Sequence, residues 1–183
     1  MPWENVVTGV SDGPTLLNNV RASAVPTHAR ATLPNNYFYI GRRIRFTISG
    51  RLSCVITTPG TARWDICMGS AGTTIVFDTG ALNLNVVAKG NVPYCLFIEL
   101  LCQSVGASTG TTFFPTAWVA SEALVGSPAA SAGGNTLLNV PVGTPALGAG
   151  FDNTASSAID LFFTQTVNTG AQTVHNYSVD ASN

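Results

Sequence analysis

The sequence predicts an all-β chain, a two-sheet sandwich that is jelly-roll-like, with an extended N-terminal arm. Three observations predict this fold. The 183 residues are rich in strand-forming Val, Ile, Thr and Phe. Many short runs alternate apolar and polar residues with a period of two, and Pro/Gly turns separate them without intervening helical patterns. An immunoglobulin-like sandwich is the second choice, because the Cys-Trp-Cys pattern of a true immunoglobulin domain is not visible at useful spacing.

The first segment, residues 1–35, differs from the remainder. Pro2, Pro14, Pro26 and Pro34 interrupt any regular element there. We expect an arm that either wraps its own sandwich or reaches onto a neighbouring subunit, and a partly disordered tail is the alternative. Residues 36–183 are expected to form one domain, since a single core is sufficient for a chain of this length.

Strands are expected throughout residues 44–179. Ile44, Phe46 and Ile48 alternate with polar residues, and Gly50 either separates two strands or bends one long strand. The segment 94–102 is apolar on both faces apart from Glu99, which predicts a strand covered on both sides in the middle of the fold. Turns are expected at 58–60 and 69–72, and a low-complexity surface loop at 126–134. The expected strands are 44–48, 52–56, 64–68, 73–78, 94–102, 111–119, 135–140, 158–166 and 172–179.

Charged residues are scarce. They make up 9% of the chain, against a typical value of about 25%, and the formal net charge is −1. Such a surface repels neighbouring molecules weakly, which favours a life in contact with other subunits. No run approaches the roughly 20 apolar residues of a membrane span, and the N-terminus lacks the pattern of a secretory signal. We therefore expect a protein made in the cytosol, without membrane insertion.

The four cysteines show none of the paired spacings of a zinc site or a redox motif. Cys54 is in phase with Leu52 and Ile56, which predicts a buried, reduced thiol in a strand. Cys67 lies in another expected strand, and Cys95 and Cys102 remain candidates for a disulfide across strands. No metal or cofactor is expected.

Residues for catalysis are few. His28 lies in the arm and His175 near the C-terminus, and neither has a recognisable catalytic context. The phosphate loop and the zinc-helix motif are absent from the sequence. Acid pairs for glycoside hydrolysis would come from scattered carboxylates, Asp65, Asp78, Glu99, Asp152 and Asp160. We assign no catalytic residue and expect no enzyme.

One local feature stands out: Arg42, Arg43, Arg45 and Arg51 bring four of the eight basic residues together within ten positions. On a strand, Arg43 and Arg45 share one face. This basic stripe predicts docking onto an acidic protein surface, and the alternative is that its arginines pair with local carboxylates. Nucleic-acid binding is disfavoured, because a net negative chain with one lysine offers few phosphate contacts.

Several segments follow one another in a distinctive order. They are ATLPNNYF at 31–38, IGRRIRF at 40–46, SGRLS at 49–53, TTPGTA at 57–62, GAL at 80–82, LFIEL at 96–100 and TPALG at 144–148. Their style and order, over roughly residues 31–166, resemble small virion proteins of tailed bacteriophages. The resemblance implies a structural component of the particle and transfers no site residues. Because the chain has no carboxylate constellation and no long fibre repeat, the shell is favoured over a tail depolymerase.

The leading hypothesis is a bacteriophage capsid decoration or cement protein that binds the outer surface of the assembled head and stabilises its lattice. Expected partners are the major capsid protein lattice and further copies of the chain, as a dimer or trimer, without nucleic acid or membrane. The expected location is the capsid surface, after assembly in the bacterial cytoplasm. Oligomer contacts are expected from a face bearing Trp64, Phe77 or Phe97. The candidate docking residues are Trp3, His28, Arg42, Arg43, Arg45 and Arg51.

Two other classes remain open. The first is a phage tail, collar or baseplate module that contacts a host receptor or glycan through the loops 106–112 or 126–134. Phe113, Phe114 and Trp118 lie close to the first of these loops. The second is a hydrolase acting on the host envelope, because a fold does not fix a function.

Overall fold

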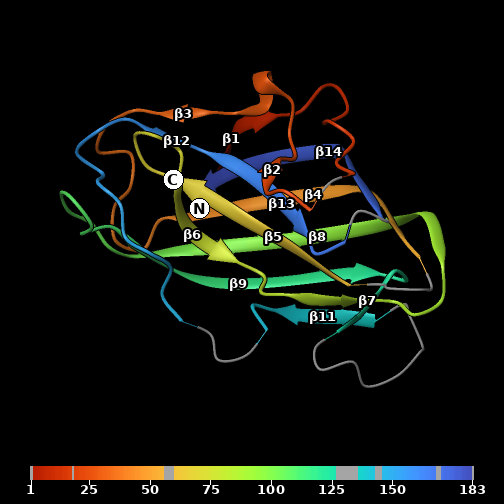
Figure 1. The fold of residues 1–183 in the computed structure, drawn as a ribbon. Helices are drawn as coiled ribbons and strands as arrows, with labels where there is room; N and C mark the ends of the chain where they lie inside the picture. Colours follow the sequence, from red (N-terminus) through yellow and green to blue (C-terminus); the bar gives the residue numbers. More distant parts are fainter. Residues whose placement is uncertain are drawn as a thin grey trace.

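The fold is a sandwich of two antiparallel six-stranded sheets, seen as two layers in Figure 1. The computed structural model describes residues 2–17, 19–55, 60–126, 136–142, 146–167 and 170–182. The predicted all-β, two-sheet class is confirmed. Within the described ranges the helical content is one 3-10 turn, η1 (Thr27–Ala29). Successive strands repeatedly change sheets, for example β4 to β5, β7 to β8 and β13 to β14, an alternation that jelly rolls share.

The strands of the two sheets are as follows. Sheet A has the order β1 (Trp3–Thr8), β14 (Ala171–Ser182), β4 (Arg43–Cys54), β8 (Lys89–Ser104), β9 (Thr112–Ser121) and β11 (Thr136–Val140). Sheet B has the order β10 (Leu124–Gly126), β7 (Leu82–Leu84), β5 (Thr61–Met68), β13 (Asp160–Gln165) and β2 (Ala22–Ser23), with β6 (Thr74–Asp78) on β5. A short pair, β3 (Thr32–Leu33) and β12 (Ser157–Ala158), lies apart.

β4 is one long strand that runs through Gly50. A Cβ atom at this position would lie 2.0 Å from the carbonyl oxygen of Thr173 and 2.9 Å from the ring of Tyr94. Only glycine fits between these neighbours without a shift of the backbone. On the adjacent strand β14 the register shifts between Val174 and Asn176, so His175 is the extra residue of a β-bulge.

Aromatic side chains from both sheets fill the core. The ring of Trp64 on β5 lies 5.2 Å from Tyr94 on β8 and 5.1 Å from Phe163, measured between centroids. Each fully buried side chain of this size contributes roughly 1.5–3 kcal/mol to folding. The prediction that Trp64 or Phe77 supplies oligomer contacts is therefore wrong. Trp64 alternates with Arg63 and Asp65 along β5 and points inward, and Phe77 is buried as well.

The N-terminal segment wraps its own sandwich. β1 forms the edge of sheet A against β14, and β2 forms the edge of sheet B against β13. Between them, the N–H groups of Gly9 and Gly13 donate to carbonyls of β14 at 2.7 and 2.8 Å. Trp3 pairs with Ser182, so the chain ends lie side by side (Figure 1). The segment 1–35 is thus extended, but its strands β1 and β2 belong to the two sheets rather than standing apart from 36–183.

The predicted strand at 94–102 lies in the middle of sheet A, within β8. The prediction that both faces of this strand are covered is wrong for the single chain. Tyr94, Leu96 and Ile98 are buried, whereas Cys95 and Phe97 on the other face reach the surface. The turn at 69–72 is confirmed by a hydrogen bond from Gly72 N to Gly69 O at 2.9 Å. The turn at 58–60 and the loop at 126–134 lie largely outside the described residues.

Candidate docking surface on sheet A

The outward side of sheet A carries a stacked aromatic pair at its centre. Phe97 on β8 and Trp118 on β9 are directly opposite one another, with ring centroids 5.7 Å apart and planes inclined by 14°. Apolar side chains on the same and neighbouring strands extend this surface along the sheet. We define the aromatic face as the outward side chains of Trp3, Arg45, Cys95, Phe97, Leu101, Phe114, Trp118, Ala120 and Leu137.

Arg45 links this pair to the N-terminal strand. Its guanidinium carbon lies 4.0 Å from the ring centroid of Trp3 and 5.3 Å from that of Phe97. The three side chains and Trp118 therefore form a continuous ladder from β1 to β9. Cation–π contacts of this kind contribute about 0.5–1 kcal/mol at exposed sites. Because it is built on strands rather than loops, this ladder is held in place before any partner arrives.

The carboxylate of Glu99 binds two of the arginines that were predicted to dock on a partner. It accepts hydrogen bonds from Arg45, at 3.0 Å, and from Arg43. Burial acts to raise the pKa of Glu99, but these hydrogen bonds outweigh it and the pKa is lowered. For Arg43 and Arg45, pairing with a local carboxylate is what the structure shows.

Arg42 is withdrawn from the surface. It is 7% exposed, forms an ion pair with Glu4, and stacks with its guanidinium carbon 3.8 Å from the ring centroid of Tyr37. Its predicted docking role does not fit this burial. Arg42 is two positions before the inward Ile44 and so is out of phase with the outward Arg43 and Arg45. It precedes β4, and the chain turns there through Gly41, whose φ is +92°.

The other predicted docking residues are divided between two places. Trp3 belongs to the aromatic face. His28 lies in η1, which is part of neither sheet, and its Nε2 accepts a 3.4 Å hydrogen bond from the N–H of Val10. Arg51 is exposed on β4, on the same side of the sheet as Arg43 and Arg45. The structure therefore gathers Trp3, Arg43, Arg45 and Arg51 on one side of sheet A, without Arg42 and His28.

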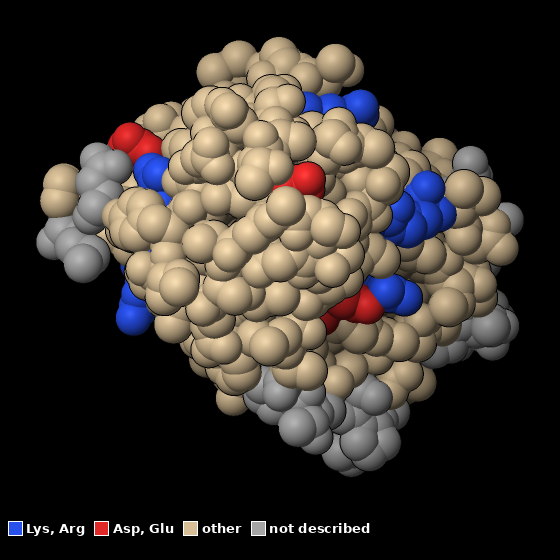
Figure 2. Space-filling view, turned by 90° about the vertical axis from the view of Figure 1, so that its left-hand side faces the viewer, with Lys and Arg blue, Asp and Glu red and all other residues tan. Residues whose placement is uncertain are grey.

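The charges of the outward side of sheet B neutralise one another. Arg21 binds Asp65, Arg63 binds Asp78 and Arg30 lies 3.4 Å from Asp160. Of the five candidate acids for glycoside hydrolysis, Asp65, Asp78, Glu99 and Asp160 thus have arginine partners, whereas Asp152 accepts hydrogen bonds from Thr154. Burial raises the pKa of Asp160, although a hydrogen bond from Ser23 acts in the opposite direction. Figure 2 shows the molecule from the left-hand side of Figure 1, where the surface is largely uncharged and the basic and acidic groups form a few separate spots.

The nearest approach to a catalytic arrangement involves Cys95, His175 and Asp12. His175 Nδ1 lies 2.8 Å from a carboxylate oxygen of Asp12, the contact expected of a base and its orienting acid. Cys95 lines the same hollow as His175, but β4 runs between their strands and no hydrogen bond joins thiol and imidazole. Sequence reasoning missed the His175–Asp12 pair, because 163 positions separate the two residues and the bulge that aims His175 has no sequence signature.

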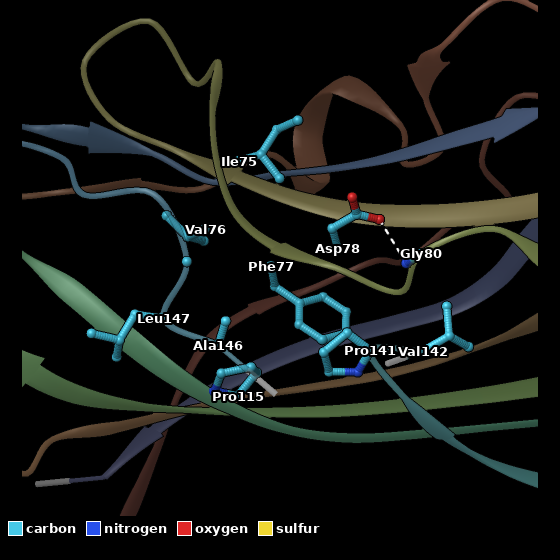
Figure 3. A pocket seen from close by; sticks show the side chains of 11 residues that line it. Ile75, Val76, Phe77, Asp78, Gly80, Pro115, Pro141, Val142, Ala146 and Leu147 are labelled. Atoms are coloured by element: carbon cyan, nitrogen blue, oxygen red, sulfur yellow. Dashed lines mark hydrogen bonds between the residues drawn. The ribbon is translucent and has the colours of Figure 1, made fainter. Parts of the chain in front are cut away.

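A second hollow lies between β6, β9 and the segment 146–148 (Figure 3). It has a volume of about 270 Å³ and an apolar lining that includes Phe77, Pro115 and Leu147. Asp78 is its charged lining residue, and that carboxylate already accepts the N–H of Gly80 at 2.8 Å and pairs with Arg63. This groove therefore provides an apolar surface, and its charged lining residue, Asp78, is already occupied by Gly80 and Arg63.

All four cysteines are free thiols, and the candidate disulfide is not formed. Cys54, Cys67 and Cys102 are buried, and burial raises the pKa of Cys67 to about 12 and that of Cys102 to about 11. Cys95 is exposed. Among the described residues, no group of three or more His, Cys, Asp or Glu is placed to hold a metal ion. Over the same residues, no helix is long and apolar enough to cross a membrane.

Comparison with known proteins adds no relative from which a function could be transferred. A scan against protein-family models and a search of curated proteins found no match to the chain.

Proposed function

We propose that this chain is a structural component of a bacteriophage virion, a decoration or cement protein that docks on the outer surface of the assembled capsid through the aromatic face. The observation that carries the proposal is the partly exposed ladder of Trp3, Arg45, Phe97 and Trp118. Large exposed apolar surfaces on folded proteins mark interaction sites. The resemblance of residues 31–166 to small virion proteins supplies the kind of partner.

The composition of the aromatic face supports a protein partner. Interface cores are enriched in Trp, Phe, Met and Arg and depleted in Lys, Glu and Asp. The face has two tryptophans, two phenylalanines and one arginine, whose neighbour Glu99 is already held by Arg43 and Arg45. Docking would therefore desolvate few unpaired charges. The resulting complex has apolar anchors at its centre and Ser and Thr side chains of β4 and β14 at its edge.

Stabilisation of the shell follows from mass action. A protein that binds only the assembled lattice stabilises it by about 2.7 kcal/mol per site when its free concentration is a hundred times its Kd. Many copies acting on one shell multiply this effect, and oligomers of the chain would add avidity. In this proposal the N-terminal segment contributes through Trp3, which is held in its own sheet, and needs no reach across a subunit boundary.

A tail, collar or baseplate module that contacts a host glycan is the second candidate. The stacked rings of Phe97 and Trp118 favour it, because a sugar ring packs its C–H groups on such an aromatic surface. Phe113, which supported loop-based contact in the sequence, is buried in the core, whereas Phe114 is exposed. Binding of the purified chain to a glycan array, abolished by Trp118→Ser, would move the proposal from shell to tail.

The test is binding of the purified chain to virions of the encoding phage that were produced without it. Trp118→Ser and Phe97→Ser should each weaken binding at least tenfold, because central aromatic anchors contribute about 2 kcal/mol or more. The control is Leu147→Ser, which removes an exposed aliphatic side chain from the groove in Figure 3. Equal weakening by all three variants, or none by the aromatic ones, would contradict docking through this face, provided the melting temperatures show that each variant is folded.

A further inference from the structure

Arg51 is the one basic side chain in the described part of the chain without an ion pair. The other seven, six arginines and Lys89, each contact a carboxylate within 4 Å. Arg51 is exposed on β4 between Thr173 of β14 and Pro93 of β8, neither of which is charged. A chain that neutralises its other cations internally leaves this guanidinium free for an external anion.

Arg51 stands in a hollow rather than on a flat surface. The hollow has a volume of about 510 Å³ and is lined by Ser49, Arg51, Asn91, Pro93, Cys95 and His175 among others. Its lining has hydroxyl, amide and thiol groups and contains no Asp or Glu. Gly50 forms its floor, where the absence of a side chain is enforced by the close approach of β14 and Tyr94. The bulge in β14 places His175 at its rim.

The unpaired cation at the hollow favours an acidic partner. The outward side chains of β4, β8 and β14 include Arg43, Arg45 and Arg51 against Glu99 and Asp180. Asp12, which contacts His175 at the rim, is a third negative charge, so these charges balance in number, but each of the three carboxylates already has a side-chain partner and Arg51 has no carboxylate partner among the described residues. Cys95 belongs both to the aromatic face and to the hollow, so the two surfaces are continuous.

We propose that this hollow receives a carboxylate side chain of the protein on which the aromatic face docks, with Arg51 as its ion-pair partner. The inference rests on the proposed function and names a chemical feature of the partner. A guanidinium can hold a carboxylate with two parallel N–H···O bonds, and Ser49 and Asn91 supply further donors at the same place. A cation at the border of an interface acts on association rate and salt dependence as well as on affinity.

The test compares Arg51→Met and Arg51→Glu with the wild-type chain in binding to virions produced without it, at several salt concentrations. We expect about threefold weaker binding for Arg51→Met and tenfold or more for Arg51→Glu, with a smaller salt dependence for Arg51→Met. The control is Arg63→Met, which removes an arginine from sheet B, away from the aromatic face and the hollow. It should leave the affinity and its salt dependence unchanged.

A photo-reactive amino acid in place of Arg51 gives a second readout, since its cross-linked peptide on the virion should contain Asp or Glu beside the linked residue. Wild-type affinity and salt dependence in both Arg51 variants, or a cross-link to a surface without acids, would overturn this inference while the docking function stands. Failure of the wild-type chain to bind would instead overturn the docking function, and the inference with it.

Discussion

The sharpest test of the fold is the removal of Arg21. This residue comes from the N-terminal segment and binds the carboxylate of Asp65, whose side chain has no exposed surface. Arg21 Nε donates to Asp65 at 3.0 Å, and its guanidinium carbon lies 3.8 Å from the ring centroid of Phe162. In Arg21→Met the stem remains, but the buried carboxylate keeps only the weak thiol donor of Cys67 at 3.4 Å.

The expected loss is large because the charge left behind is buried. Removing one partner of a buried ion pair costs about 3–5 kcal/mol. The Arg21 side chain is 35% exposed, so solvent already weakens the pair, and we expect about 2–3 kcal/mol. For a domain of this size that corresponds to a fall in melting temperature of roughly 4–12 °C.

Arg63→Met is the matched control, because Arg63 binds Asp78 with the same two-contact geometry on the same sheet face. The side chains of Arg63 and Asp78 are 41% and 32% exposed, so loss of this ion pair should cost less than about 1 kcal/mol of folding stability. Urea unfolding of the three proteins gives the free energies directly. Equal costs for Arg21→Met and Arg63→Met would refute the argument that burial of Asp65 decides the difference.

Three further predictions concern other parts of the sandwich. Iodoacetamide at neutral pH should modify Cys95 alone in the native protein, since burial raises the pKa of thiols such as Cys67, to about 12; intact mass should show one adduct, and a second would contradict this. The pKa of Glu99 is lowered on folding, so its ionised form stabilises the fold, by less than about 1 kcal/mol. This stabilisation is present above the unfolded pKa and is lost as pH falls through the folded pKa. Urea unfolding of Glu99→Gln should therefore differ from wild type at pH 7 but not at pH 2.5, and a constant difference would contradict the assignment. Gly50→Ala should lower the free energy of unfolding by about 1–3 kcal/mol through overpacking. Gly90→Ala should lower it clearly less, because no atom lies within 4 Å of its added Cβ, and equal losses in the two variants would contradict the overpacking argument.

Alternation along each strand predicted the sheets well but could not always say which side faces the core. Trp64 stands between Arg63 and Asp65, so its inward direction was available in the sequence, and the prediction that it supplies oligomer contacts overlooked this. Trp118 stands between Ala117 and Val119, where no polar neighbour marks a surface side. In β8 Phe97 shares its side with Glu99 and Gln103, so a polar signal for its outward direction was also present in the sequence.

The charges of the candidate site illustrate a second limit. The basic stripe at 42–51 was visible in the sequence, and Arg43 and Arg45 were correctly placed on one face, which Arg51 shares in the structure. Whether each of these arginines is paired depends on Glu99, which lies more than fifty positions away in the sequence. Glu99 contacts Arg43 and Arg45 only because β8 lies beside β4. Arg51 lies further along the same strand and has no such neighbour among the described residues. Long-range strand pairing therefore decides which arginine is free, and local sequence does not record it.

The most direct test of the central claim is the number of copies of this chain in each purified virion, measured by quantitative mass spectrometry against the most abundant shell protein. A decoration or cement role predicts hundreds of copies in simple proportion to the shell subunit. About a dozen copies would place the chain in the tail or collar and contradict the capsid role, and its absence from virions would contradict the virion proposal as a whole.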